Sequence, residues 1–357
     1  MPLRTAAVLA FVAALLQAPA GGPPARRFGV HVGGVPEAGQ VVRALQQLDS
    51  SWARVNDHLD GHSPDLTAYL RSGIDLVVTF NNADPQNSDS TYGSPSRFPG
   101  AGFPFRSRER YQTRVREALA PALPFLRRGR QVWAQCENEI MDAKLNPRSR
   151  FWRGTLDQYA AQLEAFAAAV HAVDPSIPVV LTSVASRTLD ALIEPSNPGH
   201  ADATRFVTRL LSSPRYDAVD LHFYGCVEDI PAKVAWVQSH LPAGRRWIST
   251  ENGGPDDRCR TTPHAYADDP SRFEQAQARQ VPARLAACAD RGGAVCLWFS
   301  LFDLRGEETA FAHLGLVDIA GAARGPARGR GSIGRGDARR KAAFDSFREF
   351  VAAHREP

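Results

Sequence analysis

Short apolar runs alternate along the chain with segments whose apolar residues recur at helical spacing. Val41, Leu45 and Leu48, for example, follow the i, i+4, i+7 spacing of an amphipathic helix. This order of strand, helix, strand and helix predicts a (β/α)8 TIM barrel, because no strand is followed by the glycine-rich phosphate turn of a doubly wound sheet. The strands are predicted at residues 28–32, 52–56, 74–80, 131–137, 177–182, 218–224, 246–251 and 294–299.

A long connection, residues 81–105, interrupts this alternation after the third predicted strand. It is rich in Pro, Gly, Ser and Asn. A loop of this length is seldom a plain connector and is more often part of a binding site. We therefore expect it to form one wall of a cleft.

Two of the predicted strands end on glutamate. Strand 131–137 runs into Asn138 and Glu139, and strand 246–251 ends on Glu251. The C-terminal ends of the strands of a parallel barrel meet at one face, where such folds have their active sites. One carboxylic acid and one carboxylate at that face favour the cleavage of glycosidic bonds with retention of configuration.

The neighbours of the two glutamates predict their roles. Arg54, at the second strand, is expected to favour the charged form of Glu251, the nucleophile. The apolar strand before Glu139 favours its protonated form as acid/base. Tyr224, two residues after His222 on the same strand face, is expected to donate to the nucleophile.

Two further residues are assigned to the site from the strand ends, and one is left out. Asn138 is expected to bind the sugar 2-hydroxyl, and Trp298 offers a flat apolar face to the sugar ring. Glu137 is left out of the site, because side chains alternate along a strand and Glu137 is turned away from Asn138.

The pattern of these residues resembles that of the retaining glycoside hydrolases of clan A, over nearly the whole chain after residue 20. Two positions differ from the pattern of the family five cellulases: Ile140 follows Asn-Glu in place of proline, and Asn81 and Asn82 stand where a histidine is expected. Family thirty-nine-like enzymes also fit. The resemblance implies a TIM barrel, a carbohydrate substrate and no cofactor or metal. The residues that carry it are Arg54, Trp133, Asn138, Glu139, His222, Tyr224, Glu251 and Trp298, and Asn81 is added as a substrate contact.

The first 20 residues predict where the protein is located. Residues 1–20 contain Arg4, an apolar run and the small-x-small sequence Ala18-Pro19-Ala20, which predicts a secretory signal peptide and a secreted or periplasmic protein. An uncleaved leader that anchors the chain is the alternative. The apolar run is too short to cross a bilayer, which takes about 20 residues. Residues 21–357 are then expected to be one catalytic domain and a monomer.

The charge of the chain argues against a nucleic-acid partner. The formal net charge is +4 over 357 residues, and the basic residues gather near the C-terminal end. The Gly- and Arg-rich residues 321–336 are expected to form a solvated loop. The rest of the chain is not basic, so we expect no binding to nucleic acid.

Five cysteines leave at least one thiol unpaired. Cys226 and Cys259 follow neighbouring strands and are the candidates for a disulfide. Cys136 and Cys296 lie inside apolar runs and are expected to be buried small hydrophobes.

Two alternatives remain open. The acidic residues and histidines after the second strand would ligate zinc if they lay on a helix, but Gly61 favours a loop that lines the sugar cleft. A catalytically silent barrel that binds glycans would need the aromatic residues but not both glutamates. The residues of the metal alternative are Asp57, His58, Asp60 and His62.

Overall fold

The computed structural model describes residues 27–32, 38–141, 151–261, 266–304, 309–318 and 338–354. The predicted signal peptide and the predicted loop at 321–336 lie outside these residues. Among the described residues, no helix is both long and apolar enough to cross a bilayer.

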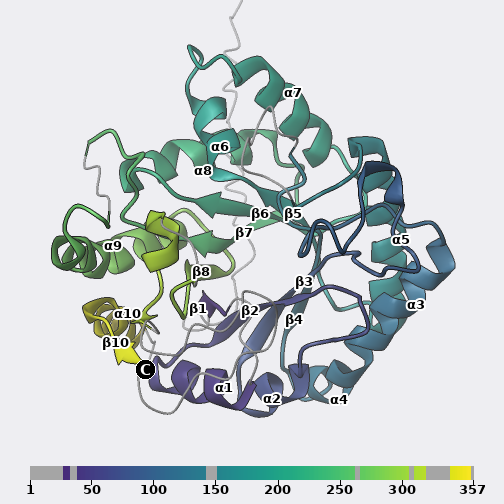
Figure 1. Cartoon of the computed structure of the whole chain (residues 1–357), viewed down its shortest axis with the longest axis horizontal. Coiled ribbons are helices and arrows are strands. Elements are labelled where there is room, and N and C mark those ends of the chain that lie inside the picture. Colours follow the sequence, from purple (N-terminus) through teal and green to yellow (C-terminus); the bar gives the residue numbers. More distant parts are fainter. Residues whose placement is uncertain are drawn as a thin grey trace, which may run out of the picture.

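Eight parallel strands close into a barrel in the order of the sequence, as predicted, and the helices surround them (Figure 1). The strands are β1 (Phe28–His31), β2 (Trp52–Asp57), β3 (Asp75–Phe80), β4 (Val132–Cys136), β5 (Val179–Val184), β6 (Ala218–Phe223), β7 (Arg246–Asn252) and β8 (Cys296–Phe299). Each pairs with its sequence neighbours, and β1 closes the ring on β8.

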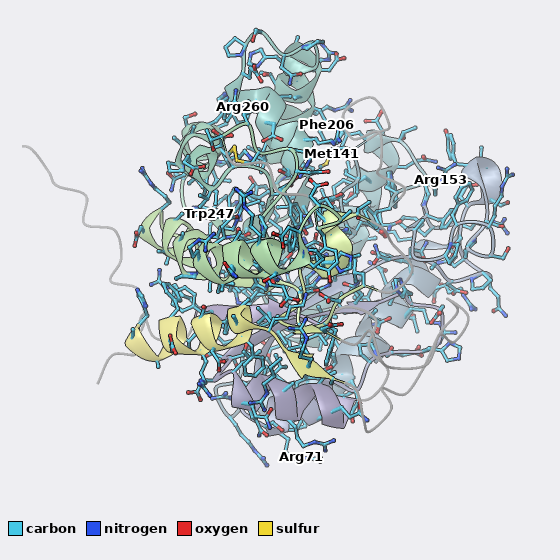
Figure 2. All side chains as sticks on the ribbon, turned by 60° about the vertical axis from the view of Figure 1, so that its left-hand side comes forward. Arg71, Met141, Arg153, Phe206, Trp247 and Arg260 are labelled. Atoms are coloured by element: carbon cyan, nitrogen blue, oxygen red, sulfur yellow. A yellow bond between two sulfur atoms is a disulfide. The ribbon has the colours of Figure 1, made fainter. Side chains whose placement is uncertain are left out.

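The helices follow the strands with few exceptions. Two helices lie between β5 and β6, and a second small sheet pairs β9 with β10 in antiparallel register. Figure 2 shows α9 and α10 side by side on the outside of the barrel. The helices are α1 (Ala38–Gln47), α2 (Leu66–Arg71), α3 (Arg108–Leu119), α4 (Leu123–Leu126), α5 (Leu156–Val173), α6 (Ser186–Ile193), α7 (His200–Leu211), α8 (Ile230–His240), α9 (Pro270–Asp290) and α10 (Ala342–Ala353), with β9 at Val317–Asp318 and β10 at Arg339–Arg340.

The described residues form three apolar clusters, and the two largest are separated by the strands. One fills the space between strands and helices. The other fills the lower part of the barrel interior, towards the N-terminal ends of the strands, where inward-facing apolar side chains pack against one another. This inner cluster consists of Trp52, Val77, Trp133, Val180, Ala218, Ile248, Val295 and Leu297.

Above the apolar cluster, the barrel interior becomes polar. Moving two residues along β2 from Trp52 leads to Arg54, which is 1% exposed, and the same step on β4 leads from Trp133 to Gln135, which is fully buried. Side chains two apart share a face of a strand. The barrel therefore changes from apolar to polar along its axis, towards the C-terminal ends of the strands.

Two disulfides are present among the described residues. Cys226 and Cys259 are bonded, which confirms the pairing predicted from the sequence. Cys136 is a buried free thiol, as expected. Cys296 is not: it is bonded to Cys288 of α9. The sequence prediction was wrong there because the helix brings Cys288 over the strand, within 6.1 Å between Cα atoms.

The inner cluster predicts a large loss of stability on truncation of Trp52. Its ring meets that of Trp133 edge to face, with centroids 6.1 Å apart. Trp52→Ala should lower the free energy of unfolding by about 3–5 kcal/mol, because a large cavity is left inside the barrel. Urea unfolding would measure it.

Trp236→Ala is the matched control, because Trp236 lies partly exposed on α8 and stacks on His240. It should cost about 1 kcal/mol. Equal losses for the two variants would contradict the assignment of Trp52 to the core of the barrel.

Candidate active site

Glu251, near the end of β7, is held by a cation and a hydroxyl. Arg54 Nη1 lies 2.5 Å from its Oε1, and the Tyr224 hydroxyl donates to its Oε2 at 2.7 Å. The Glu251 side chain is 12% exposed, whereas that of Arg54 is 1% exposed. Both contacts expected of Glu251 are therefore present, and the carboxylate still reaches solvent.

Glu139 and Asn138 follow β4 through a tight irregular turn. Glu137 has φ 63° and Glu139 has φ 39°, in the left-handed region that non-glycine residues rarely adopt. The turn allows consecutive side chains to reach the barrel mouth, which a regular strand would not. Asn138 Oδ1 accepts bonds from Arg54 Nη2 at 2.8 Å and from the Ser183 hydroxyl at 2.9 Å.

His222 connects the two glutamates. Its Nδ1 lies 2.7 Å from Glu139 Oε1 and 3.3 Å from Glu251 Oε2. Its Nε2 lies 3.2 Å from Asp220 Oδ2. Burial opposes charge on the ring, but the carboxylates of Glu251 and Asp220 outweigh it and raise the pKa of His222 to about 10. The imidazole is therefore charged at neutral pH, and both of its nitrogens donate.

The carboxyl groups of Glu139 and Glu251 lie close together. One oxygen of each, together with a nitrogen of His222, fall within 4.8 Å of one another. Although burial acts to raise it, the charges of His222 and Arg54 hold the pKa of Glu251 well below its ordinary value. Glu251 is therefore ionised at neutral pH.

Asp220, which the sequence did not single out as a site residue, lies fully buried below His222. Burial alone would raise its pKa, but His222 and other partners lower it. Its oxygens accept bonds from Gln135, Ser183 and Thr250. Register shifts in β5, β6 and β7 help to turn these side chains inward, as β-bulges commonly do beside active sites.

Trp298 does not reach the cleft, so its predicted contact with sugar was wrong. It is fully buried, and its Nε1 donates to the carbonyl of Leu314 at 2.9 Å. Because side chains alternate along β8, the next residue, Phe299, faces the barrel mouth instead. Its ring lies 5.0 Å from that of His31 and 5.9 Å from that of Tyr224, between centroids.

The predicted contact of Asn81 with substrate was also wrong. Asn81 is 2% exposed, and its amide donates to Glu137 at 3.1 Å. Glu137 is fully buried and also accepts bonds from the Asn82 backbone and from Gln162. Burial raises the pKa of Glu137 to about 8, against these donors. Glu137 therefore does point away from the site, and it fastens the start of the loop at 81–105.

The same loop is held to Glu137 at a second point. A Cβ atom on Gly102 would lie 1.6 Å from Glu137 Oε2, so only glycine allows this approach. Gly102 in turn exchanges backbone hydrogen bonds with residues on either side of Trp152. The loop predicted to wall the cleft is thus attached to the strand that carries Glu139.

The histidines after β2 do not form a metal site in the described part of the chain. His62 pairs with Asp60 at 3.3 Å, and both are exposed. Asp57 is 1% exposed and caps the backbone of Leu59. The ligand atoms of this segment do not meet as a group of three.

Two groups of three potential ligands do come together among the described residues. The first is Cys226, Glu228 and Cys259, but its sulfurs are bonded to each other. The second is Glu139, His222 and Glu251. There, the guanidinium of Arg54 and the charged ring of His222 already supply the positive charge that a metal ion would bring.

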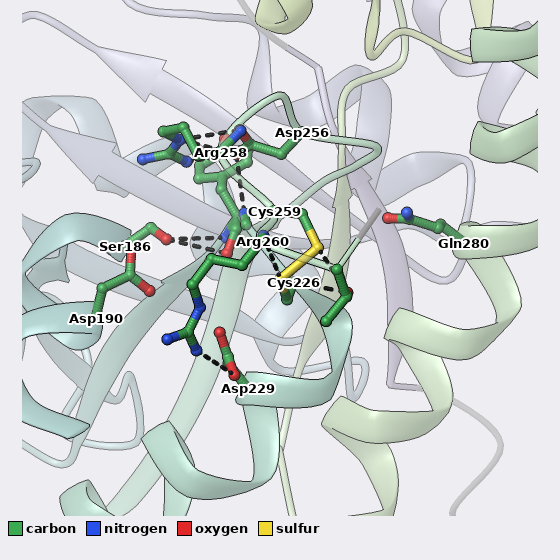
Figure 3. The surroundings of a disulfide bond; sticks show 12 residues. Ser186, Asp190, Cys226, Asp229, Asp256, Arg258, Cys259, Arg260 and Gln280 are labelled. Carbon is green, nitrogen blue, oxygen red and sulfur yellow. Dashed lines mark hydrogen bonds and ion pairs between the residues drawn. A yellow bond between two sulfur atoms is a disulfide. The ribbon is translucent and has the colours of Figure 1, made fainter. Parts of the chain in front are cut away.

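The Cys226–Cys259 disulfide joins the loops that follow β6 and β7 (Figure 3). Cys226 comes two residues after Tyr224. A second link, from the backbone of Gly225 to Asp256 at 2.9 Å, runs between the same loops. These bonds fix the loop that carries Tyr224 against the strand that carries Glu251.

Solved structures share the barrel at low sequence identity. The Ignisphaera aggregans GH53 catalytic domain matches 93% of this chain and 97% of its own, with a TM-score of 0.55 and 16% identity. A glucosidase from Croceicoccus marinus matches 92% of this chain and 68% of its own, with a TM-score of 0.55 and 14% identity. At such identities the likeness establishes the fold.

A third solved structure is much longer than this chain. It is an FMN-binding β-glucuronidase from Facaelibacterium prausnitzii L2-6, with a TM-score of 0.55 and 14% identity. The match covers 93% of this chain and 44% of the glucuronidase. No model of a known protein family matches the chain, and no curated protein matches it.

The raised pKa of His222 predicts a pH-dependent contribution to stability. Charging this ring is more favourable in the folded protein, so its contribution is complete below the unfolded pKa of about 6.5. It should be lost as the pH rises towards 10. The difference in free energy of unfolding between wild type and His222→Gln should therefore shrink across this window, when followed by urea unfolding.

His171→Gln, on the exposed side of α5, is the control for loss of an imidazole. A His222→Gln difference that grew from pH 6.5 to pH 10 would contradict the charged state assigned to the ring.

Proposed function

We propose that this chain is a retaining β-glycoside hydrolase in which Glu251 is the nucleophile and Glu139 the acid/base. The observation that carries the proposal is that one carboxylate oxygen of Glu139 and one of Glu251 lie within 4.8 Å of each other. Retaining glycosidases need about 5–5.5 Å between these groups, whereas inverting enzymes need a wider gap for water. The solved structures with a similar fold include enzymes named as a glucosidase and a β-glucuronidase.

The roles follow from the charges around each carboxyl group. Glu251 has Arg54 and His222 beside it and is ionised, as a nucleophile must be. Asp220 is likewise committed to the ionised form by its neighbours. Glu139 is the other carboxyl group that lies against His222 and keeps access to solvent, so we assign it the acid/base role.

The reaction has two displacements. Glu251 attacks the anomeric carbon while Glu139 gives its proton to the departing glycosidic oxygen, so a glycosyl ester forms and the aglycone leaves as an alcohol. Water then attacks the same carbon and gives a proton to Glu139. The bond to Glu251 breaks, and both carboxyl groups return to their first state.

The substrate proposed is a polysaccharide or oligosaccharide. Export through the predicted signal peptide, a monomeric state and the absence of a cofactor stay predictions of the sequence. Hydrolysis of 4-nitrophenyl β-glycosides by the purified protein tests the activity directly. A protein that binds glycans but hydrolyses none of them would instead fit the catalytically silent alternative.

Azide should separate the two roles. With an aryl glycoside, Glu139→Ala should lower turnover by about 10²–10⁴-fold for want of a general base. Azide should restore turnover and give a glycosyl azide of retained configuration, because Glu251 still forms the ester. Glu251→Ala should give the inverted azide. NMR of the products distinguishes the two.

Glu194→Ala, at an exposed position after α6, is the control and should behave as wild type. If Glu139→Ala gave the inverted azide and Glu251→Ala the retained one, the nucleophile and the acid/base would have to be exchanged. Full turnover by both active-site variants would sink the glycosidase proposal.

Tyr224→Phe should shift the pH profile. The hydroxyl of Tyr224 donates to Glu251 at 2.7 Å and contributes to its lowered pKa. Its loss should raise the pKa of Glu251, so the acid limb of kcat/KM should move to higher pH. Tyr216→Phe, which loses a bond to the carbonyl of Leu211 on the outside of the barrel, should leave that limb where it is. An acid limb that moves down in Tyr224→Phe would refute this role.

A further inference from the structure

His31 is buried in the candidate site with neither ring nitrogen hydrogen-bonded. It is 6% exposed, and both Nδ1 and Nε2 lack a partner. Asn56 has a buried Oδ1 in the same condition. Buried polar groups in folded proteins are nearly always paired, so an unpaired one requires an explanation.

These two side chains come from the first two strands, on either side of Arg54. His31 ends β1 and is paired in register with Arg54 of β2 on one side and Phe299 of β8 on the other. Asn56 comes two residues after Arg54 and shares its inward face. The charges of Arg54, Glu251 and His222 all act on His31, so its ring lies among the catalytic groups.

His31 is uncharged, in contrast to His222. Burial and the charge of Arg54 lower its pKa to about 3. A neutral imidazole has one donor and one acceptor nitrogen. It can therefore give one hydrogen bond to a hydroxyl group and take another, whereas an imidazolium can only donate.

The two cations of the site are already engaged. Arg54 donates through Nε to Thr79 at 2.8 Å, and its other two nitrogens bind Glu251 and Asn138. Both nitrogens of His222 face carboxylates. The groups left to receive a ligand on the β1 and β2 side are thus neutral, and their natural partners are hydroxyl groups.

We propose that His31 and Asn56 bind hydroxyl groups of an uncharged sugar ring held against Glu251, and so select the sugar at the cleavage position. The inference rests on the proposed glycosidase activity. The hydroxyl groups of the substrate then supply the hydrogen-bond partners that the two ring nitrogens of His31 lack. A uronic acid would instead bring a further negative charge beside the ionised Glu251.

His31→Phe tests this role, because it removes both ring nitrogens and keeps an aromatic ring against Phe299. Its melting temperature should equal or exceed that of wild type, because an unpaired buried polar group is replaced by an apolar one. Its kcat/KM for the best 4-nitrophenyl β-glycoside of wild type should fall by about 10–100-fold. His31→Gln, which keeps a donor and an acceptor, should recover part of that loss.

A set of monodeoxy 4-nitrophenyl glycosides identifies the bond. Wild type should lose activity on the analogue that lacks the contacted hydroxyl, and His31→Phe should lose little more on that analogue than on the parent. His354→Phe is the matched control. His354 packs on Phe350 and on Phe28, which begins β1 at the opposite end of the barrel, so its replacement should leave kcat/KM unchanged.

The outcomes separate the inference from the proposed function. If wild type cleaves no glycoside, the glycosidase proposal fails and this inference with it. If wild type is active but His31→Phe matches it, the inference alone fails. It also fails if His31→Phe lowers the melting temperature and activity on every analogue alike, or if wild type prefers a β-glucuronide to the matching β-glucoside.

Discussion

The buried ion pair between Arg54 and Glu251 is the interaction on which the upper half of the barrel depends. Arg54 is 1% exposed and donates to Thr79 of β3, to Glu251 of β7 and to Asn138 beyond β4. A guanidinium withdrawn from water is tolerated only when acceptors replace the water, and removal of one partner costs about 3–5 kcal/mol. Since these acceptors come from three strands, one side chain both fixes their C-terminal ends and sets the charge of the nucleophile.

His222 likewise depends on neighbouring charged groups to keep its own charge. Its ring needs Glu251 and Asp220 to remain charged while fully buried, and Glu251 needs the ring and Arg54 to remain ionised. Neither group would hold its state alone, because burial opposes the charge of each. The site is therefore a coupled cluster whose members titrate together. Its two glutamates keep access to solvent, with side chains 11% and 12% exposed, whereas Glu137 on the other side of the turn is fully buried and serves the loop.

Periodicity in the sequence was enough to predict the eight strands and the barrel, because parallel buried strands are continuous apolar runs. The placement of Glu139 and Glu251 at the barrel mouth followed from strand ends, and that of Tyr224 from alternation, whereas Arg54 was placed near the nucleophile by the family resemblance. Alternation failed where the backbone is irregular or the frame was misjudged: Trp298 was assigned the inward face that belongs to Phe299. Asn81 was misassigned because its partner, Glu137, meets it only through tertiary structure. His31 carried a weak signal, a histidine at the end of the first strand, but its lack of partners is visible only when all eight strands are assembled.

The hydrogen bonding of the inward-facing side chains changes along the barrel axis. The lowest inward layer is apolar and needs no partners. The middle layer is polar, and its members bind one another: Thr79 to Gln135, Gln135 to Asp220, and Asp220 to Thr250. In the upper layer the partners run out at His31 and at Asn56. Low dielectric makes a satisfied network rigid and an unsatisfied group costly. The rigid middle layer thus supports an upper layer whose hydrogen bonds are left for a ligand to complete.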